Sequence, residues 1–146
     1  MSQNTVGLVL GGVVPAVLLG AYAALQKASA QSGFGPGMIL VVIGAAVIAG
    51  GLLVCLATKD WSFPLRALHY PVLTGAVWAA ATGLIAISLA RYRTPMSVLA
   101  PLFNMNTLVA VFISMAAFSE WKTVRTPRLA IAAVLVVIGG VLAATA

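Results

Sequence analysis

The sequence predicts an all-α integral membrane protein with five transmembrane helices in a single membrane domain, residues 1–146. Of its 146 residues, 62% are hydrophobic and only 7% are charged, and the mean hydropathy is +1.13. Soluble domains carry about 25% charged residues. A chain so poor in charge cannot cover a folded surface with polar groups, so lipid must solvate much of it. The apolar residues also fall into five long runs rather than being scattered.

Each of the five runs is long enough to cross a bilayer. A helix needs about 20 mostly apolar residues to cross a hydrocarbon core roughly 30 Å thick. Because lipid offers the backbone no hydrogen bonds, such runs should be helical, and none shows the alternation that is typical of barrel strands. The predicted spans are Val6–Gln26, Met38–Thr58, Pro71–Ala90, Met96–Phe118 and Leu129–Thr145. The last run is the shortest, and we expect its helix to extend toward Arg125.

Short links separate the runs and contain residues that end helices. Glycines and a proline in Gln31–Gly37 interrupt the first helix before the second begins. The longest link, Lys59–Tyr70, contains three aromatic residues of the kinds that are enriched at the membrane–water interface. The link Arg91–Pro95 is tight, and in Glu120–Arg128 the residue Pro127 can open the last helix.

Basic residues are divided unequally between the two faces of the membrane. With five spans, the termini lie on opposite faces. The N-terminal face holds Lys59, Arg66, Lys122, Arg125 and Arg128, and the opposite face holds Lys27, Arg91 and Arg93. The positive-inside rule therefore favours a cytoplasmic N-terminus by only two residues. Two alternatives stay open, a fixed orientation or insertion both ways up (dual topology).

The charged and reactive residues exclude several classes of function. A formal charge of +6 would indicate nucleic-acid binding in a soluble protein. Here all eight Lys and Arg lie outside the apolar runs or at their ends, so they are read as topology determinants and no nucleic-acid partner is expected. One His, one Cys and two carboxylates form no cluster along the chain. We therefore expect neither an enzyme nor a cofactor nor a metal site.

The fourth run contains three residues that are unusual in a membrane span, Pro101, Asn104 and Asn106. Pro101 lacks a backbone N–H and clashes with the carbonyl of Ser97, which predicts a helix kink. The two asparagines are about 200° apart on an ideal helix, so one can line a cavity while the other bonds to a neighbouring helix. Polar residues inside spans often mark solute pathways. The alternative is two interhelical hydrogen bonds, each on the order of 0.6 kcal/mol.

Further candidates for substrate binding lie on the first and third runs. Tyr22 with Gln26, and Trp78 with Thr82, form pairs one helical turn apart on one helix face. In a cavity the aromatic rings would offer apolar walls and cation–π contacts of roughly 0.5–2 kcal/mol each, whereas the alternative is ordinary packing. Lys27 is either an interfacial anchor or an anion contact at a cavity mouth. Without a carboxylate, such a pocket would suit neutral or amphiphilic solutes, or a cation held by aromatic faces alone.

Small residues in the last run predict a close helix contact. Gly139 and Ala143, and likewise Gly140 and Ala144, have the spacing that lets two helix backbones approach. The run has almost no polar side chains. We therefore expect these four residues to serve dimer packing.

The order of motifs over the whole chain resembles a known repeat. From Ala90 onward these motifs are an Ala-x-Tyr-Arg turn, a helix with small and polar residues at its middle, a terminal Ser-Glu, a basic link, and a last helix ending Gly-Gly-Val-Leu. Before it, Leu18–Gly37 reads "LLGAYAALQKASAQSGFGPG", a helix closing on a lysine before a Gly/Pro link. Together, from about Val6 to Ala144, they resemble an EamA-type repeat of the drug/metabolite transporter superfamily.

This resemblance implies half of a transporter. Members of the superfamily commonly hold two five-helix repeats, inverted relative to each other, with the substrate path between them. The chain would then be one half of an inverted-repeat fold, completed as an antiparallel homodimer or paralogue heterodimer. Its other partners would be a small-molecule substrate and membrane lipid, in a prokaryotic inner (plasma) membrane.

One departure limits what the resemblance implies, and one alternative function stays open. The small multidrug-resistance branch carries a glutamate in its first helix, and that place falls on Val17 here. Proton-coupled cation export is therefore not expected. The alternative function is a non-transporting membrane subunit, such as an assembly or pore-forming protein, which would use its asparagines only to hold helices together.

Overall fold

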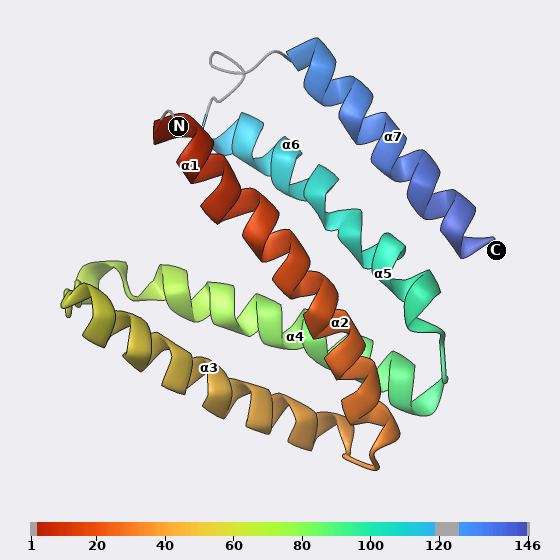
Figure 1. The fold of residues 1–146 in the computed structure, drawn as a ribbon, viewed down its shortest axis with the longest axis horizontal. Helices are drawn as coiled ribbons and strands as arrows, with labels where there is room; N and C mark the ends of the chain where they lie inside the picture. Colours follow the sequence, from red (N-terminus) through yellow and green to blue (C-terminus); the bar gives the residue numbers. More distant parts are fainter. Residues whose placement is uncertain (1–2, 119–125, 146) are drawn as a thin grey trace. The chain divides into compact units, whose positions relative to one another are not determined.

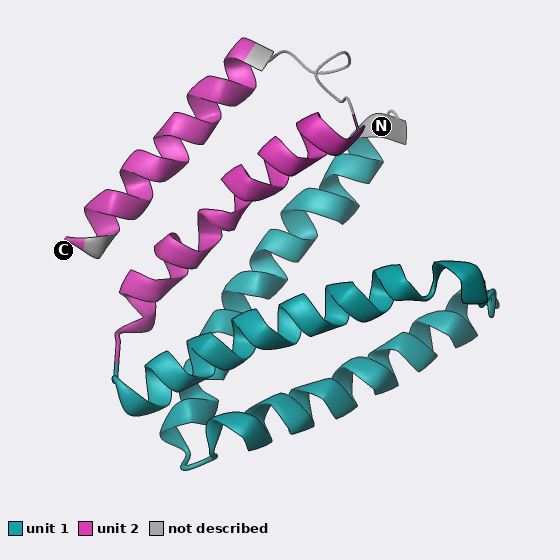
Figure 2. Ribbon diagram, turned by 180° about the vertical axis from the view of Figure 1, so that it is seen from behind, with its two compact units in different colours: residues 1–93 teal, residues 94–146 magenta. Residues whose placement is uncertain are grey.

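The chain is described by a computed structural model over residues 3–118 and 126–145, where its only regular secondary structure is helical, with no strands (Figure 1). Its contacts divide it into two compact units, residues 1–93 and 94–146 (Figure 2). Each unit is described by itself, so the single membrane domain stays a prediction. Lys122 and Arg125, which were assigned to the N-terminal face, and the Ser-Glu motif lie outside the described residues.

Among the described residues, four helices are long and apolar enough to cross a membrane. They are Thr5–Gln31, Pro36–Thr58, Leu65–Arg91 and Met96–Phe118. They contain the first four predicted spans, as a multi-pass membrane protein requires. The fifth apolar helix, Pro127–Ala143, is shorter. A count of five transmembrane helices therefore stays a prediction.

Unit 1 consists of three long helical segments. The first comprises α1 (Gln3–Leu8), the π-helical turn η1 (Val9–Val13) and α2 (Val14–Gln31). The second is α3 (Pro36–Thr58), and the third comprises the 3₁₀ turn η2 (Leu65–Ala67) and α4 (His69–Arg91). Pro36 opens α3, where its missing N–H costs nothing.

The π-helical turn lies directly before a proline. The Val14 N–H donates to the carbonyl of Val9, five residues back instead of four. Pro15, the next residue, has no N–H to donate. A π turn inserts one extra residue into a helix. The first segment thus passes Pro15 as one continuous helix with a local change of register.

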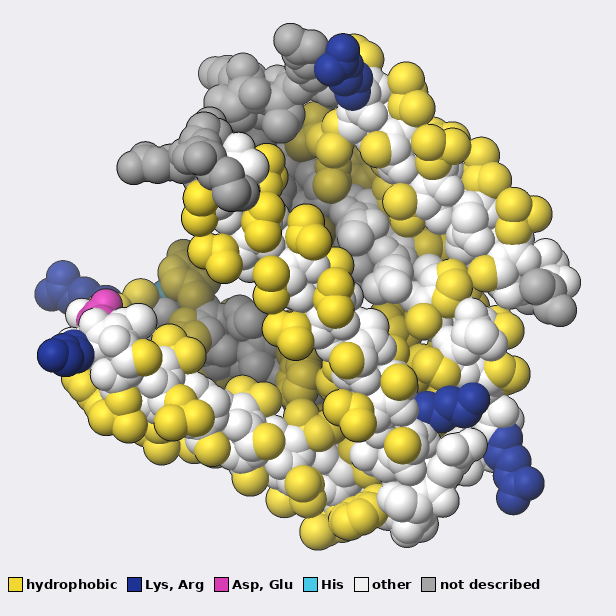
Figure 3. All heavy atoms as spheres, viewed as in Figure 1, with side chains coloured by type: hydrophobic (Ala, Val, Ile, Leu, Met, Phe, Trp, Pro, Cys, Tyr) yellow, Lys and Arg dark blue, Asp and Glu magenta, His cyan; other side chains and the backbone are white. Residues whose placement is uncertain are grey.

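Within unit 1, α3 and α4 run antiparallel and side by side, and α2 contacts α4 more than α3 (Figure 1). Small residues allow these contacts. Gly83 of α4 is buried, and a Cβ there would lie 2.9 Å from Cδ1 of Leu40 on α3. Most large apolar side chains remain exposed along the helices, while the Lys and Arg side chains in view gather near helix ends (Figure 3). This distribution fits a chain whose solvent is lipid.

Unit 2 contains α5 (Met96–Asn104), α6 (Asn106–Phe118) and α7 (Thr126–Ala144). The predicted fourth span is interrupted at Met105, four residues beyond Pro101. The Met105 N–H donates to the carbonyl of Leu102, three residues back, at 3.1 Å. The Thr107 hydroxyl donates to the carbonyl of Asn104 at 3.0 Å. A side-chain hydroxyl thereby takes the place of a backbone donor at the interruption.

Helix α7 packs on α5 through Gly140, next to this interruption. A Cβ at Gly140 would lie 2.9 Å from the sulfur of Met105 and 3.6 Å from the carbonyl oxygen of Pro101. A Cβ at Gly139 would meet no atom of the described residues within 4 Å. Gly140 is therefore used within the chain, whereas Gly139 remains open to the predicted dimer contact. Ala143 is half-buried, and the side chain of Ala144 lies outside the described residues.

Replacing Gly140 by Leu should lower the free energy of unfolding by about 1–3 kcal/mol, because the added side chain overpacks against Met105. Helicity followed during detergent denaturation of the purified chain measures this. Gly139→Leu is the matched control, since it meets open space within the chain. It should leave unfolding unchanged and alter only the dimer fraction. Equal losses in both variants would contradict the α5–α7 contact.

Candidate functional site

Two polar–aromatic pairs meet between α2 and α4, and we call Tyr22, Gln26, Trp78 and Thr82 the α2–α4 cluster. The Tyr22 hydroxyl donates to Oγ1 of Thr82 at 3.3 Å. Nε2 of Gln26 donates to the backbone carbonyl of Thr82 at 3.2 Å. The rings of Tyr22 and Trp78 have centroids 6.4 Å apart and are tilted by 42°, within the range that favours aromatic pairs.

Chain direction explains why the pairs match. In the chain, α3 follows α2 and runs back in the opposite direction before α4 begins. As a result, α2 and α4 run in the same general direction (Figure 1). Tyr22 therefore faces Trp78 and Thr82, while Gln26, one turn on, faces the carbonyl of Thr82. Sequence spacing predicted each pair on one helix face but carried no signal that the two faces would meet.

The cluster is enclosed at its polar end and open at its aromatic end. Gln26 is 2% exposed and Thr82 is 3% exposed, whereas Trp78 is 41% exposed. Buried alanines lie beside the polar end, Ala23 on α2 and Ala86 on α4. Small buried side chains of this kind allow two helices to approach closely.

One buried polar atom of the cluster is unpaired. Oε1 of Gln26 has no hydrogen-bond partner among the described residues. A carbonyl can only accept, so the amide nitrogen of Gln26 must face Thr82 and Oε1 must point away from it. An unsatisfied buried acceptor costs about 1–3 kcal/mol. Sequence reasoning identified Gln26 but could not identify this free oxygen.

All four side chains of the cluster are uncharged. The nearest charge along the chain is Lys27, which is exposed.

Outside the spans, the hydroxyl and N–H of Ser62 donate to Asp60 at 2.6 and 3.0 Å. These hydrogen bonds lower the pKa of Asp60 below its ordinary value and fix a turn in the link after α3. The described residues contain no group of three His, Cys, Asp or Glu that could hold a metal.

Asn104 and Asn106 belong to unit 2, on either side of Met105, and both are exposed. The Asn104 carbonyl accepts the hydroxyl of Thr107. Their role in substrate binding stays a prediction.

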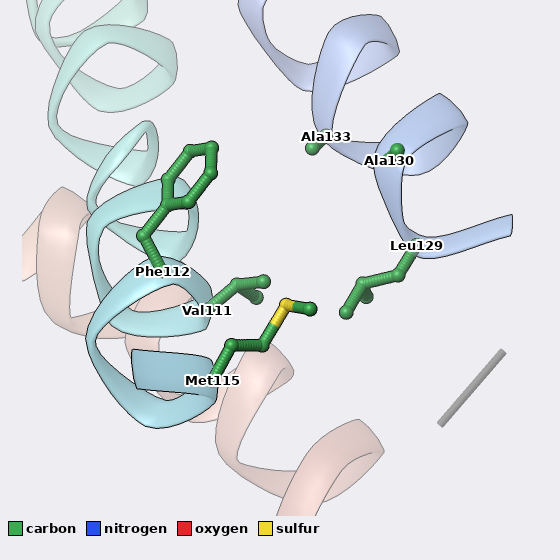
Figure 4. A pocket seen from close by; sticks show the side chains of 6 residues that line it. All are labelled: Val111, Phe112, Met115, Leu129, Ala130 and Ala133. Atoms are coloured by element: carbon green, nitrogen blue, oxygen red, sulfur yellow. The ribbon is translucent and has the colours of Figure 1, made fainter. Parts of the chain in front are cut away.

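Unit 2 also contains a wholly apolar groove of about 110 Å³ between α6 and α7. It is lined by Val111, Phe112, Met115, Leu129, Ala130 and Ala133 (Figure 4). In Figure 4 the side chains of Met115 and Leu129 point toward each other across it. With no polar atom in its lining, the groove can accommodate hydrocarbon but cannot orient a polar group. The sequence held no sign of it, because its residues are those of any span.

Substituting Gln26 by Leu should leave the free energy of unfolding unchanged or raise it by about 1 kcal/mol. The change removes one interhelical hydrogen bond of roughly 0.6 kcal/mol but also removes an unpaired buried acceptor. Tyr22→Phe loses only the hydrogen bond to Thr82, so it should lower the free energy of unfolding by roughly 0.6 kcal/mol. Denaturation in detergent measures the free energy of unfolding of both variants, and Gln31→Leu, at an exposed position, is the control. A loss above about 1 kcal/mol for Gln26→Leu would show that Oε1 is satisfied.

No known protein family matches this chain, and comparisons with curated proteins and with solved structures gave no match.

Proposed function

We propose that the chain is a half-size membrane transporter that moves a small neutral, amphiphilic or cationic solute by alternating access. Its working unit is an antiparallel dimer, either a homodimer or a pair with a paralogue. The observation that carries the proposal is the α2–α4 cluster, with its unpaired Gln26 oxygen and partly open aromatic end.

Polar groups buried between two membrane-spanning helices lower the stability of the fold unless their hydrogen bonds are satisfied. In lipid, interhelical hydrogen bonds contribute only about 0.6 kcal/mol on average, less than the 1–3 kcal/mol that an unpaired buried acceptor costs. An apolar pair of side chains would therefore hold α2 and α4 together at least as well. Polar residues inside spans commonly mark solute pathways, and that use accounts for the cluster.

Two further features support the transporter class. The fourth span is discontinuous at Met105, and discontinuous helices are typical of secondary transporters. The difference of two basic residues between the faces permits insertion both ways up. Together with the resemblance to an EamA-type repeat, this favours two oppositely oriented copies of one half.

The rival function is a non-transporting membrane subunit, such as an assembly or pore-forming protein. The hydrogen bonds to Thr82 are contacts that such a subunit would also use to hold its helices. It would need only one orientation in the membrane, whereas an antiparallel homodimer needs both.

The antiparallel homodimer and the non-transporting subunit differ in where the C-terminus lies. Reporters active only in the cytoplasm, or only outside it, can be fused after Ala146 and compared at equal expression. We expect both to give signal, because a bias of two basic residues does not fix orientation. Signal from one side alone would contradict the antiparallel homodimer and favour the subunit. Adding two Lys to one face is the control, and should silence one reporter.

A further inference from the structure

We infer that Oε1 of Gln26 is the hydrogen-bond acceptor for the solute, and that the solute is an uncharged, partly apolar molecule with an N–H or O–H donor. This inference rests on the proposed function and specifies its substrate class.

The acceptor is assigned by elimination within the cluster. The amide nitrogen of Gln26 is held by the Thr82 carbonyl at 3.2 Å, so the amide cannot reverse without placing two acceptors against each other. The Tyr22 hydroxyl already donates to Thr82 Oγ1. Oε1 remains as a buried acceptor without a partner. A bound group that donates a hydrogen bond would satisfy this acceptor.

The cluster favours an uncharged donor over an ion. None of its residues is Asp, Glu, Lys, Arg or His, and the nearest charge in the sequence is the cation Lys27. An ammonium group bound at Oε1 would therefore lack a counter-ion, and an unpaired buried ion is costly. A carboxylate would present a second acceptor to Oε1. A neutral N–H or O–H group meets neither difficulty.

The aromatic residues define the rest of the solute. Tyr22 and Trp78 stand 6.4 Å apart between ring centroids, and Trp78 is partly exposed. A flat apolar ring attached to the donor can pack against them while the donor reaches Gln26 one turn away. Indole-like, phenol-like and benzylic alcohol-like molecules have this form.

Binding requires the contact between α2 and α4 to loosen, since Oε1 is fully enclosed here. The enclosed state leaves Oε1 unpaired, whereas a bound state pairs it. A solute with a donor therefore favours the open state more than a solute of the same shape without one, and shifts the population toward it.

Indole and 1-methylindole test the inference, because they differ only by replacement of N–H with N–CH₃. Binding is measured by calorimetry on the full chain in lipid nanodiscs, with empty nanodiscs subtracted. We expect indole to bind about tenfold more tightly, the effect of one well-placed hydrogen bond. Gln26→Leu should abolish this preference, and exposed Gln31→Leu should retain it.

Equal affinity for the two indoles, a preference that survives Gln26→Leu, or tighter Gln26-dependent binding of benzyltrimethylammonium would each overturn the inference. Equal affinity is also the result if a tightly held water satisfies Oε1. These results leave the transporter proposal standing if the C-terminus is found on both sides. Binding of neither indole also overturns the inference, and a single orientation of the C-terminus separately overturns the antiparallel homodimer.

Discussion

Thr82 is the point at which α2 is joined to α4, and the arrangement of unit 1 depends on it. Apolar helices gain little from meeting each other in lipid, because the lipid chains are as apolar as the helices. Specific contacts must then select which faces pack. Here Thr82 receives the hydroxyl of Tyr22 on its side chain and the amide of Gln26 on its backbone carbonyl. Small neighbours, among them Ala23 and Ala86, allow the approach.

In the proposed transporter, the same contact links stability to function. Holding Gln26 against the Thr82 carbonyl orients its oxygen away from any donor. The closed helix pair is therefore less stable than an apolar equivalent would be, by an amount that a bound donor could restore. A helix contact of this kind can open at modest cost, as the proposed alternating access requires. In unit 2, Gly140 lets α7 pack beside the interruption at Met105, where the backbone is already irregular.

Hydropathy and length were sufficient to predict the helical fold and the first four spans, and the i, i+4 spacing predicted that Tyr22 and Gln26 share one helix face. They could not predict that this face meets Trp78 and Thr82, since long apolar spans offer several equivalent faces for packing. Pro101 signalled an irregular helix, but the interruption falls at Met105, where a Leu102 carbonyl and the Thr107 hydroxyl supply alternative hydrogen bonds. Gly139 and Gly140 were equivalent in the sequence, and only packing distinguishes them.

Solute access to Thr82 tests the central claim most directly. Cys55, the sole native cysteine, is replaced by Ala, and Thr82→Cys or Leu84→Cys is introduced on α4. Intact cells are then treated with a membrane-impermeant maleimide. The account predicts that Cys at position 82 is labelled, that indole protects it, and that Cys at position 84 is not labelled, because it lies on the opposite, exposed face of α4, which we expect to face lipid. A folded protein that remains unlabelled at position 82 would show that the α2–α4 contact is sealed and only holds two helices together.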